Sequence, residues 1–315
     1  MFLRMKNIMN YKLFFNFSLS RLGLGTWQAA GGESWSGHSD EELLAAYHYA
    51  LNGGVNFIDT APVYGCGHSE ELVGRLIADY QRDKLFIATK CGLPQHGRRI
   101  KSDLSYNSIL TECDESLRRL NTDYIDLYQV HWPPLGKNAV YNIEETISAM
   151  KHLQNVGKIR FVGICNHSLA DTKIWHESGI LSSYQGLYNL IDRNPTEFHG
   201  TPLPYRTEDE ILPFVRETGI AFFPYCPLAQ GLLSGKYSSQ DNAARLSRYD
   251  VRWSNSHYKN VKAGIIPTEI QNKSAEELLT AAFSFLTDKP EVTSVITGMS
   301  SVEQVKENMK YCCMI

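Results

Sequence analysis

The chain alternates eight times between a short β-rich run and a longer stretch of helical periodicity, and this alternation restricts its fold more than any other feature. Runs rich in Val, Ile, Phe and Tyr predict strands at 22–27, 56–61, 85–91, 125–131, 159–166, 182–189, 220–227 and 293–298. Apolar residues at helical spacing predict helices at 39–51, 69–79, 104–120, 143–156, 168–178, 208–218, 274–287 and 301–310. Eight consecutive βα units without a break in composition predict one α/β domain over residues 1–315, folded as a (β/α)8 TIM barrel.

An open, doubly wound sheet is the alternative for alternating strands and helices. Such a sheet usually carries a dinucleotide site of the form Gly-x-Gly-x-x-Gly after its first strand. Here Gly23 and Gly25 are followed by Thr26, Trp27 and Gln28, so the third glycine is absent. The closed barrel is therefore favoured.

Two segments lie outside this repeat. Lys6 and Lys12 interrupt the apolar residues of the first 17 positions, so we expect a ragged start and a short hairpin there and no secretory signal. The connection 228–272 is long and rich in aromatic residues, which argues against disorder. Its place after the seventh strand predicts a flap over a ligand at the barrel mouth.

Charge and cysteine content exclude several classes of protein. The chain has 31 Lys and Arg against 34 Asp and Glu, a net charge of −3, which gives no support for a nucleic-acid or membrane partner. No apolar run approaches the length of a membrane span. The seven cysteines form no Cys-x-x-Cys pair, so we expect no metal site and reduced thiols in a cytoplasmic protein. The pair Cys312–Cys313 is expected in an exposed tail.

Four side chains with acid–base chemistry follow three neighbouring predicted strands. Asp59, Lys90 and His131 end the second, third and fourth strands, and Tyr64 lies five residues beyond Asp59. Because barrel active sites lie at the carboxyl ends of the strands, we expect these residues to converge. An ammonium favours ionisation of a nearby phenol, a carboxylate holds the lysine, and an imidazole can orient an oxygen. Each residue alone has an ordinary structural role, but together they can protonate a carbonyl oxygen while another group attacks the carbon.

Hydrolysis of phosphate or sugar bonds is a weaker alternative for a barrel of this kind. It would need paired carboxylates or metal ligands at the strand ends. Asp59 is the only carboxylate that the prediction places there.

Nine segments of the chain together resemble the aldo-keto reductase family. They span residues 21–308 in the family's order, and the layout is similar to its bacterial and plant branch of stress-associated reductases and sugar dehydrogenases. The segments are 25–27, 54–65, 68–74, 88–90, 116–133, 157–166, 188–193, 224–237 and 294–308. The resemblance implies a (β/α)8 barrel and a catalytic tetrad of Asp59, Tyr64, Lys90 and His131. It implies that Tyr64 is the general acid in reduction and the general base in oxidation, with hydride from C4 of a nicotinamide.

The same resemblance implies NADP(H) as the cofactor. It assigns the carboxamide to Asn166 and Gln185, with Cys165 where many members have Ser, and stacking on the nicotinamide to Tyr225. Gly298 and Gln304 stand where many NADP-preferring members have Lys and Arg, so we expect a reduced preference for NADP over NAD. The full set of implied cofactor residues is Thr26, Trp27, Asp59, Cys165, Asn166, Gln185, Tyr225, Cys226, Pro227, Leu228, Gly231, Leu232, Ser234, Lys236, Gly298, Ser300, Ser301, Gln304 and Asn308.

The expected substrate pocket is rich in aromatic residues, which suit an apolar or flat carbonyl compound. Its residues are Trp27, Trp35, Tyr64, His131 and Trp132. A basic cluster in the loop 91–107 could attract an anionic substrate, although a solvated surface is the more ordinary interpretation. It comprises Gln95, His96, Arg98, Arg99 and Lys101. The resemblance also implies that many members continue beyond this point with a segment that walls the pocket, whereas the sequence has only seven residues after Asn308. We therefore expect a more open site that accepts a broader range of substrates.

Two functions remain open at this point. The first is an NADP(H)-dependent carbonyl reductase or alcohol dehydrogenase acting on a small molecule. The second is a cofactor-binding regulatory subunit of a membrane channel with slow or no turnover, since some family members act in this way.

Overall fold

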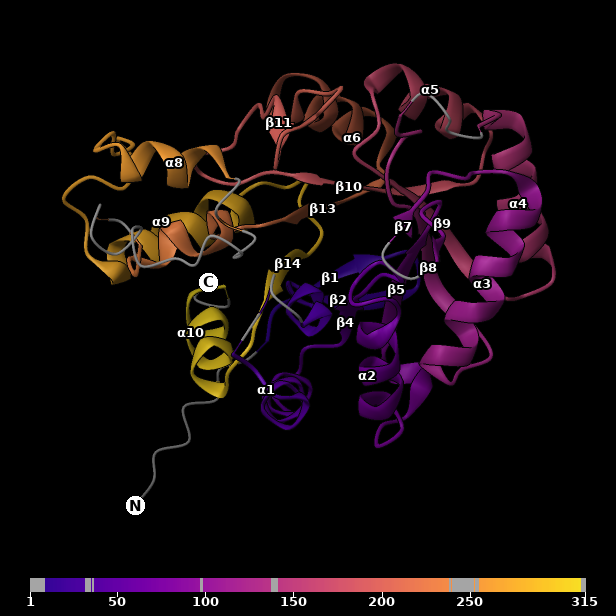
Figure 1. Ribbon diagram of the computed structural model, residues 1–315, viewed down its shortest axis with the longest axis horizontal. Helices are drawn as coiled ribbons and strands as arrows, with labels where there is room; N and C mark the ends of the chain where they lie inside the picture. Colours follow the sequence, from indigo (N-terminus) through magenta and orange to yellow (C-terminus); the bar gives the residue numbers. More distant parts are fainter. Residues whose placement is uncertain are drawn as a thin grey trace.

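Eight parallel strands close into a barrel with helices around it (Figure 1). The computed structural model describes residues 9–31, 35, 37–96, 99–136, 141–237, 239, 252 and 255–312, without the side chains of residues 96 and 99. Around the barrel the strands are β3 (Leu22–Gly25), β4 (Phe57–Asp59), β5 (Phe86–Cys91), β8 (Ile125–Val130), β9 (Ile159–Cys165), β10 (Leu181–Leu187), β13 (Ala221–Tyr225) and β14 (Val295–Gly298). The predicted (β/α)8 class is confirmed, although each strand is shorter than its sequence prediction.

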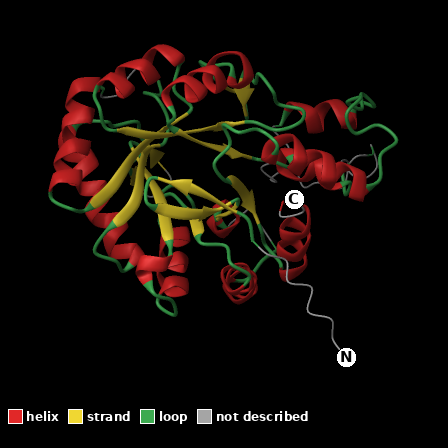
Figure 2. Cartoon of the chain, turned by 180° about the vertical axis from the view of Figure 1, so that it is seen from behind, coloured by secondary structure: helices red, strands yellow, loops and turns green. Residues whose placement is uncertain are grey.

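Helices surround the strands on the outside of the barrel (Figure 2). Those that alternate with the strands are α1 (Asp40–Asn52), α2 (His68–Ile77), α3 (Tyr106–Leu120), α4 (Ile143–Asn155), α5 (Leu169–Glu177), α6 (Leu212–Thr218), α9 (Ala275–Thr287) and α10 (Val302–Cys312). The predicted helix 208–218 begins as a π-helical turn, η3 (Thr207–Ile211). The predicted capping box is present at Ser39 and Glu42 of α1.

The start of α2 differs from its prediction. The helix begins at His68 rather than at the predicted Ser69, and its N-cap is Gly67 in a left-handed conformation (φ 94°). The Ser69 hydroxyl is buried instead, 2.7 Å from the Thr26 hydroxyl and 2.9 Å from that of Thr60. Ser69 therefore ties α2 to the ends of β3 and β4, a tertiary role that its capping propensity does not reveal.

An N-terminal hairpin packs on the N-terminal side of the barrel, as predicted. It consists of β1 (Tyr11–Phe14) and β2 (Phe17–Ser20), while residues 1–8 lie outside the described residues. The Phe14 ring meets Phe86, Phe161 and Phe223 edge-on at centroid distances of 4.9–6.0 Å. This apolar cluster fills the N-terminal end of the barrel interior.

The first and last strands close the barrel. Gly25 of β3 is in register with Gly298 of β14. Below this seam, the buried Arg21 guanidinium donates to the carbonyls of Val292, Thr293 and Thr287. One side chain therefore satisfies three backbone acceptors from the chain before β14.

Three excursions leave the barrel after β5, β10 and β13. The first two are the hairpins β6 (Gln95–His96) with β7 (Arg99–Ile100), and β11 (Glu197–Phe198) with β12 (Thr201–Pro202). The third holds the 3-10 turn η4 (Ala229–Ser234) and α8 (Ser256–Lys262), which lies beside α9 (Figures 1 and 2). These elements share a small core with Leu232, Tyr258 and Leu278. Residues 238, 240–251 and 253–254 of the expected flap lie outside the described residues.

The prediction of an exposed C-terminal cysteine pair was wrong for the member that can be assessed. Cys312 is fully buried because α10 continues to it and packs it into the main core. Cys313 lies outside the described residues. None of the described helices has the length and apolar character needed to cross a membrane.

Candidate active site

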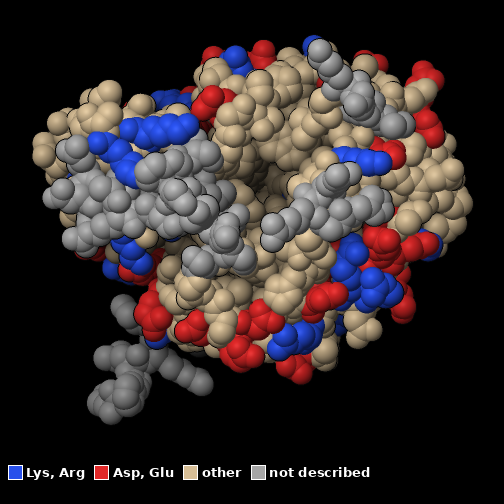
Figure 3. All heavy atoms as spheres, in the orientation of Figure 1, with Lys and Arg blue, Asp and Glu red and all other residues tan. Residues whose placement is uncertain are grey.

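A cavity of about 620 Å³ opens at the carboxyl ends of the barrel strands. Three of the four predicted catalytic residues, Asp59, Tyr64 and His131, line it, and Lys90 lies directly behind them. Figure 3 shows a hollow near the middle of one face of the molecule, with most charged side chains of that face away from it. The cavity continues along loops after β13 and β14, which makes it long enough to hold more than a small carbonyl compound.

The Lys90 ammonium joins the acidic and phenolic groups. Its Nζ donates to both carboxylate oxygens of Asp59, at 2.9 and 2.8 Å, and to the Thr60 carbonyl at 2.9 Å. It also donates to the Tyr64 hydroxyl at 3.4 Å. Burial disfavours the charged amine, but Asp59 and Tyr64 outweigh it and raise the pKa of Lys90. Lys90 is therefore a fixed positive charge beside the phenol.

Burial controls the protonation of Tyr64 and His131. It raises the pKa of Tyr64 to about 12, while Lys90 acts in the opposite direction. Lys90 does lower the pKa of Tyr64, as expected. The net shift is nevertheless upward, because the effect of burial is larger. Burial, followed by the Lys90 charge, places the pKa of His131 well below its ordinary value. At neutral pH the phenol carries its proton and the imidazole, whose ring lies 5.9 Å from that of Tyr64, is neutral.

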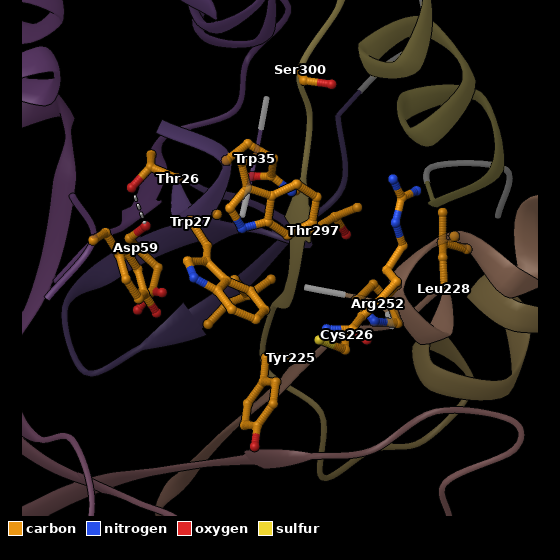
Figure 4. Close-up of a pocket in the computed structure, with 18 of the residues that line it drawn as sticks. Thr26, Trp27, Trp35, Asp59, Tyr225, Cys226, Leu228, Arg252, Thr297 and Ser300 are labelled. Atoms are coloured by element: carbon orange, nitrogen blue, oxygen red, sulfur yellow. Dashed lines mark hydrogen bonds between the residues drawn. The ribbon is translucent and has the colours of Figure 1, made fainter. Parts of the chain in front are cut away.

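The backbone around Asp59 and Tyr64 is held by neighbouring strand ends. Thr26 donates both its backbone N–H and its hydroxyl to the Asp59 carbonyl, each at 3.0 Å (Figure 4). After Tyr64 the chain turns at Gly65, where φ is 68° and a Cβ would overlap the backbone of Ala30. The glycine thus allows the Tyr64 loop to lie against the loop that follows β3.

Two tyrosines orient the side-chain amide of Asn166, one of the residues predicted to bind the nicotinamide carboxamide. The Oδ1 atom of Asn166 accepts from the hydroxyls of Tyr205 and Tyr225, each at 2.9 Å. Its Nδ2 donates to the His131 carbonyl at 3.4 Å, on the cavity side. Because both tyrosines occupy the oxygen, the amide N–H₂ is the group that remains for a ligand.

Gln185 and Cys165, the other two residues predicted near the carboxamide, are hydrogen-bonded toward Asp59 of the tetrad. Gln185 lines the cavity, but its Nε2 donates to Asp59 Oδ1 at 2.9 Å. Cys165 is fully buried, does not line the cavity, and its Sγ donates to Gln185 Oε1 at 3.3 Å. The thiol thus lies behind Gln185, where it can orient that amide.

The remaining predicted cofactor residues gather along the loops after β13 and β14. Leu232 is the exception after β13, because it is buried in the small core beside α9, and Ser301 does not line the cavity either. The Ser300 N–H and hydroxyl both donate to Gln304 Oε1, at 2.9 and 3.2 Å, and the Gln304 N–H donates to the Ser301 hydroxyl at 3.3 Å, so Gln304 ties the start of α10 to the residues before it. The predicted residues that do line this part are Cys226, Pro227, Leu228, Gly231, Ser234, Lys236, Gly298, Ser300, Gln304 and Asn308.

Comparison with known proteins decides the family. The model of the Aldo/keto reductase family matches residues 21–314. The chain belongs to the aldo/keto reductase family.

The family consists of oxidoreductases that act on carbonyl substrates, and its individual members give a finer view. The chain is 32% identical to Aldo-keto reductase YhdN of Bacillus subtilis over 91% of this chain and 83% of that protein. It is 31% identical to an NADH-specific methylglyoxal reductase of Escherichia coli over 93% and 90% of the two chains. Its fold is similar to that of the glycerol dehydrogenase AKR11B4 from Gluconobacter oxydans, with a TM-score of 0.74, 30% identity and coverage of 97% and 90%.

As an aldo-keto reductase, the chain has an apolar outer pocket that sequence reasoning identified only in part. Trp27, Trp35 and Trp132 line it as predicted, and the Trp27 and Trp35 rings lie 5.4 Å apart (Figure 4). Phe198, from the β11–β12 hairpin, packs 6.1 Å from Trp27 and 5.4 Å from Tyr225. No local signal marks Phe198, because a two-residue strand has no readable periodicity.

Gln95 and Lys101, the two members of the predicted basic cluster whose side chains are described, do not line this pocket. Lys101 is exposed and does not line the cavity, whereas the neighbouring Ile100 does. Arg98 lies outside the described residues, and the side chains of His96 and Arg99 are not described.

Three further residues that line the cavity were also missed, namely Gln28, Arg252 and Glu307. Gln28 packs where a side chain at position 298 would begin, and a Cβ on Gly298 would overlap its amide. Arg252 lies with its guanidinium carbon 4.8 Å from the Tyr237 ring. Glu307 lines the cavity beside Asn308, on the same turn of α10.

Proposed function

We propose that this chain is an NADP(H)-dependent oxidoreductase that reduces aldehydes or ketones to alcohols, or runs the reverse reaction on sugars. The observation that carries the proposal is the Lys90 ammonium, which contacts the Asp59 carboxylate and the Tyr64 phenol at the base of the cavity. A charged lysine beside a protonated phenol is an arrangement for delivering a proton to a carbonyl oxygen.

The residues of the elongated cavity fit a dinucleotide. Asn166 offers an oriented amide N–H₂, and Gln28 has a buried Oε1 with no hydrogen-bond partner among the described residues. Gly298, which has no Cβ, lets the Gln28 amide lie directly against the end of β14. We assign the nicotinamide end to Asn166, Gln185 and Tyr225, and the adenosine end to Gly298, Ser300, Gln304 and Asn308. When bound, the nicotinamide supplies or accepts a hydride at C4.

Each tetrad residue has one task in this proposal. Tyr64 Oη donates its proton to the carbonyl oxygen during reduction and takes it back during oxidation. Lys90 stabilises the phenolate that this step leaves, and Asp59 keeps Lys90 charged and in place. Neutral His131 orients the substrate oxygen by hydrogen bonding without competing for the proton.

A modest preference for NADP(H) over NAD(H) is part of the proposal. Lys236 and Arg252 supply positive charge to the cavity within the described residues, which suits a 2′-phosphate. Glu307 and the neutral Gln304 weaken that attraction. The NADH-specific relative from Escherichia coli supports a small margin.

We expect an apolar carbonyl compound as the substrate and the cytoplasm as the location. Val63, Leu93, Ile100 and Phe198 add to the apolar wall that the tryptophans form. Cys91, Cys113, Cys165 and Cys226 are free thiols, as a reducing compartment keeps them.

A titration followed by a turnover assay tests the proposal. Purified protein is titrated with NADPH and NADH while protein fluorescence is recorded, and cofactor absorbance is then followed with a panel of aliphatic, aromatic and sugar aldehydes. We expect NADPH to bind more tightly than NADH, with turnover on aromatic and short aliphatic aldehydes. Preferred binding of NADH would reverse the cofactor assignment. Binding without turnover on any carbonyl would contradict the enzyme and favour the regulatory subunit.

A further inference from the structure

Glu112 is a buried carboxyl that takes no part in the tetrad. It lies on α3, on the outside of the barrel, with 5% of its surface exposed, and it does not line the cavity. Unlike Glu70, which pairs with Arg119, it has no cationic partner among the described residues. A buried acid without a counter-ion is costly, so its hydrogen bonds indicate what it does.

The partners of Glu112 are backbone groups at the end of β5. The Gly92 N–H donates to both carboxylate oxygens, at 3.1 and 3.2 Å. The Leu93 backbone N–H also stabilises the carboxylate, and the Ser108 hydroxyl donates to Oε1 at 3.3 Å. The side chain therefore spans from α3 to the two residues at which the chain leaves the barrel.

This segment adjoins two tetrad residues. Lys90 lies two positions before Gly92, and the carbonyl of Cys91 between them accepts the His131 backbone N–H at 3.0 Å. Leu93 in turn lines the cavity. A shift of the 91–93 backbone would therefore move Lys90, His131 and the pocket wall together.

Gly92 cannot hold this position by itself. Its φ of 89° lies in the region that glycine adopts freely, so its own conformational preference does not restrain the turn. A residue with a Cβ would be strained at this φ and would displace the Leu104 side chain, so a stiffer residue is disfavoured. The restraint must come from hydrogen bonds, and Glu112 supplies those to the N–H groups.

We propose that Glu112 is a positioning residue of this aldo-keto reductase. By holding the backbone N–H groups of Gly92 and Leu93, the Glu112 carboxyl fixes Lys90 and His131 in place. The inference rests on the proposed function of the tetrad. Small misplacements of reacting groups reduce rates strongly, by as much as about 100-fold for a displacement near 1 Å.

The charges around Glu112 determine which substitution at this position can keep the hydrogen bonds to the backbone. Burial raises the pKa of Glu112 to about 8, with the hydrogen bonds from Gly92, Ser108 and Leu93 opposing it. The titratable groups around it are Cys91, Cys113, Tyr128 and Asp103, none of them basic. An uncharged side chain with an acceptor oxygen, such as Gln, therefore preserves the contact, whereas Leu does not.

The test compares Glu112→Leu with Glu112→Gln, and with Glu115→Gln as a control on the exposed side of α3. We expect Glu112→Leu to lower kcat about 10- to 100-fold while the Kd for NADPH changes less than about twofold. Glu112→Gln should restore kcat to within about threefold of wild type. A folded Glu112→Leu protein with wild-type kcat would overturn the proposal, because a purely structural role changes thermal stability alone.

Amide hydrogen exchange of the cofactor-free protein tests the positioning without turnover. In Glu112→Leu the peptides that contain residues 91–93 and 131 should exchange faster, and in Glu112→Gln and Glu115→Gln they should not. Unchanged exchange in Glu112→Leu would overturn the inference. A wild-type protein without turnover would overturn the proposed function alone. If Glu112→Leu does not fold, Glu112→Ala carries the same comparison.

Discussion

At the scale of single residues, desolvation shifts the pKa values of Tyr64 and His131 more strongly than neighbouring charge does, whereas the pKa of Lys90 is set by its neighbours. Burial raises the pKa of Tyr64 to about 12, so the phenol keeps its proton at neutral pH although Lys90 lies within hydrogen-bond distance. His131 stays neutral because burial and the same ammonium act in one direction on its pKa. Of Tyr64 and His131, the Tyr64 phenol is therefore the group that can act as the acid at neutral pH.

Removing that proton tests the role of Tyr64. We expect Tyr64→Phe to bind NADPH like wild type and to lose about 100- to 10,000-fold in kcat, because the ring remains and only the acid is absent. The measurement is steady-state reduction of the best aldehyde beside a fluorescence titration. Tyr80→Phe, at a partly exposed tyrosine far from the cavity, is the control. Wild-type kcat in Tyr64→Phe would show that another group is the acid.

At the scale of elements, one ion pair holds α8 to the turn after β10. His257 Nε2 lies 2.7 Å from Asp192 Oδ1, and Asn255 at the start of α8 donates to Gln230 Oε1 at 2.8 Å. Tyr258 adds a bond from its hydroxyl to the Gln230 carbonyl at 3.1 Å. These contacts attach α8 to η4, whose residues line the cavity, so the loop after β13 is held from its outer side.

The His257–Asp192 pair makes this attachment pH-dependent. Burial lowers the pKa of His257, but Asp192, with Glu269 farther away, outweighs it, and the net shift is upward. The charged pair therefore adds stability that is complete below the unfolded pKa of about 6.5 and is lost as pH rises through the higher folded pKa. We expect His257→Gln to reduce the free energy of unfolding by roughly 1 kcal/mol at pH 6, and by less at pH 9.

Urea unfolding at the two pH values measures this effect. His48→Gln is the control, because its partner Asp79 is largely exposed and 3.7 Å away. An equal loss for His257→Gln at both pH values would contradict the assigned ion pair.

At the scale of the whole molecule, one arginine reinforces the closure of the barrel. Four residue pairs join β14 to β3, and Arg21 adds bonds to the carbonyls of Thr287, Val292 and Thr293 below this seam. Because the donor precedes the first barrel strand and the acceptors lie between the end of α9 and the last strand, the bonds exist only in the closed barrel.

Truncating this arginine should destabilise the entire fold. We expect Arg21→Met to lower the free energy of unfolding by about 3 kcal/mol, because three carbonyls lose a charged donor in a site with little water. Urea unfolding with fluorescence detection measures it. Arg75→Met, which removes an exposed pair with Asp40, should cost less than about 1 kcal/mol. A similar small loss for Arg21→Met would mean that water replaces the guanidinium.

Local patterns of the chain were sufficient for the order and type of its main elements. The alternation of strands and helices and the capping box at Ser39 depend on neighbours within a few residues, and the structure has both. The four tetrad positions follow from strand ends together with the family resemblance, and the barrel brings them together. Ser69 and Cys312 show the limit, because their side chains are buried by elements far away in the sequence.

The sequence alone therefore determined the barrel, the family and which side chains lie at the strand ends, since these follow from short-range periodicity and motif order. Only the tertiary structure decided that Tyr205 orients Asn166 across 39 positions, that Phe198 closes the pocket, and that Glu112 holds the end of β5. It also decided the protonation of Tyr64, because a pKa depends on the water that packing removes. Such contacts join distant segments and leave no local pattern, so they exist only once the barrel has closed.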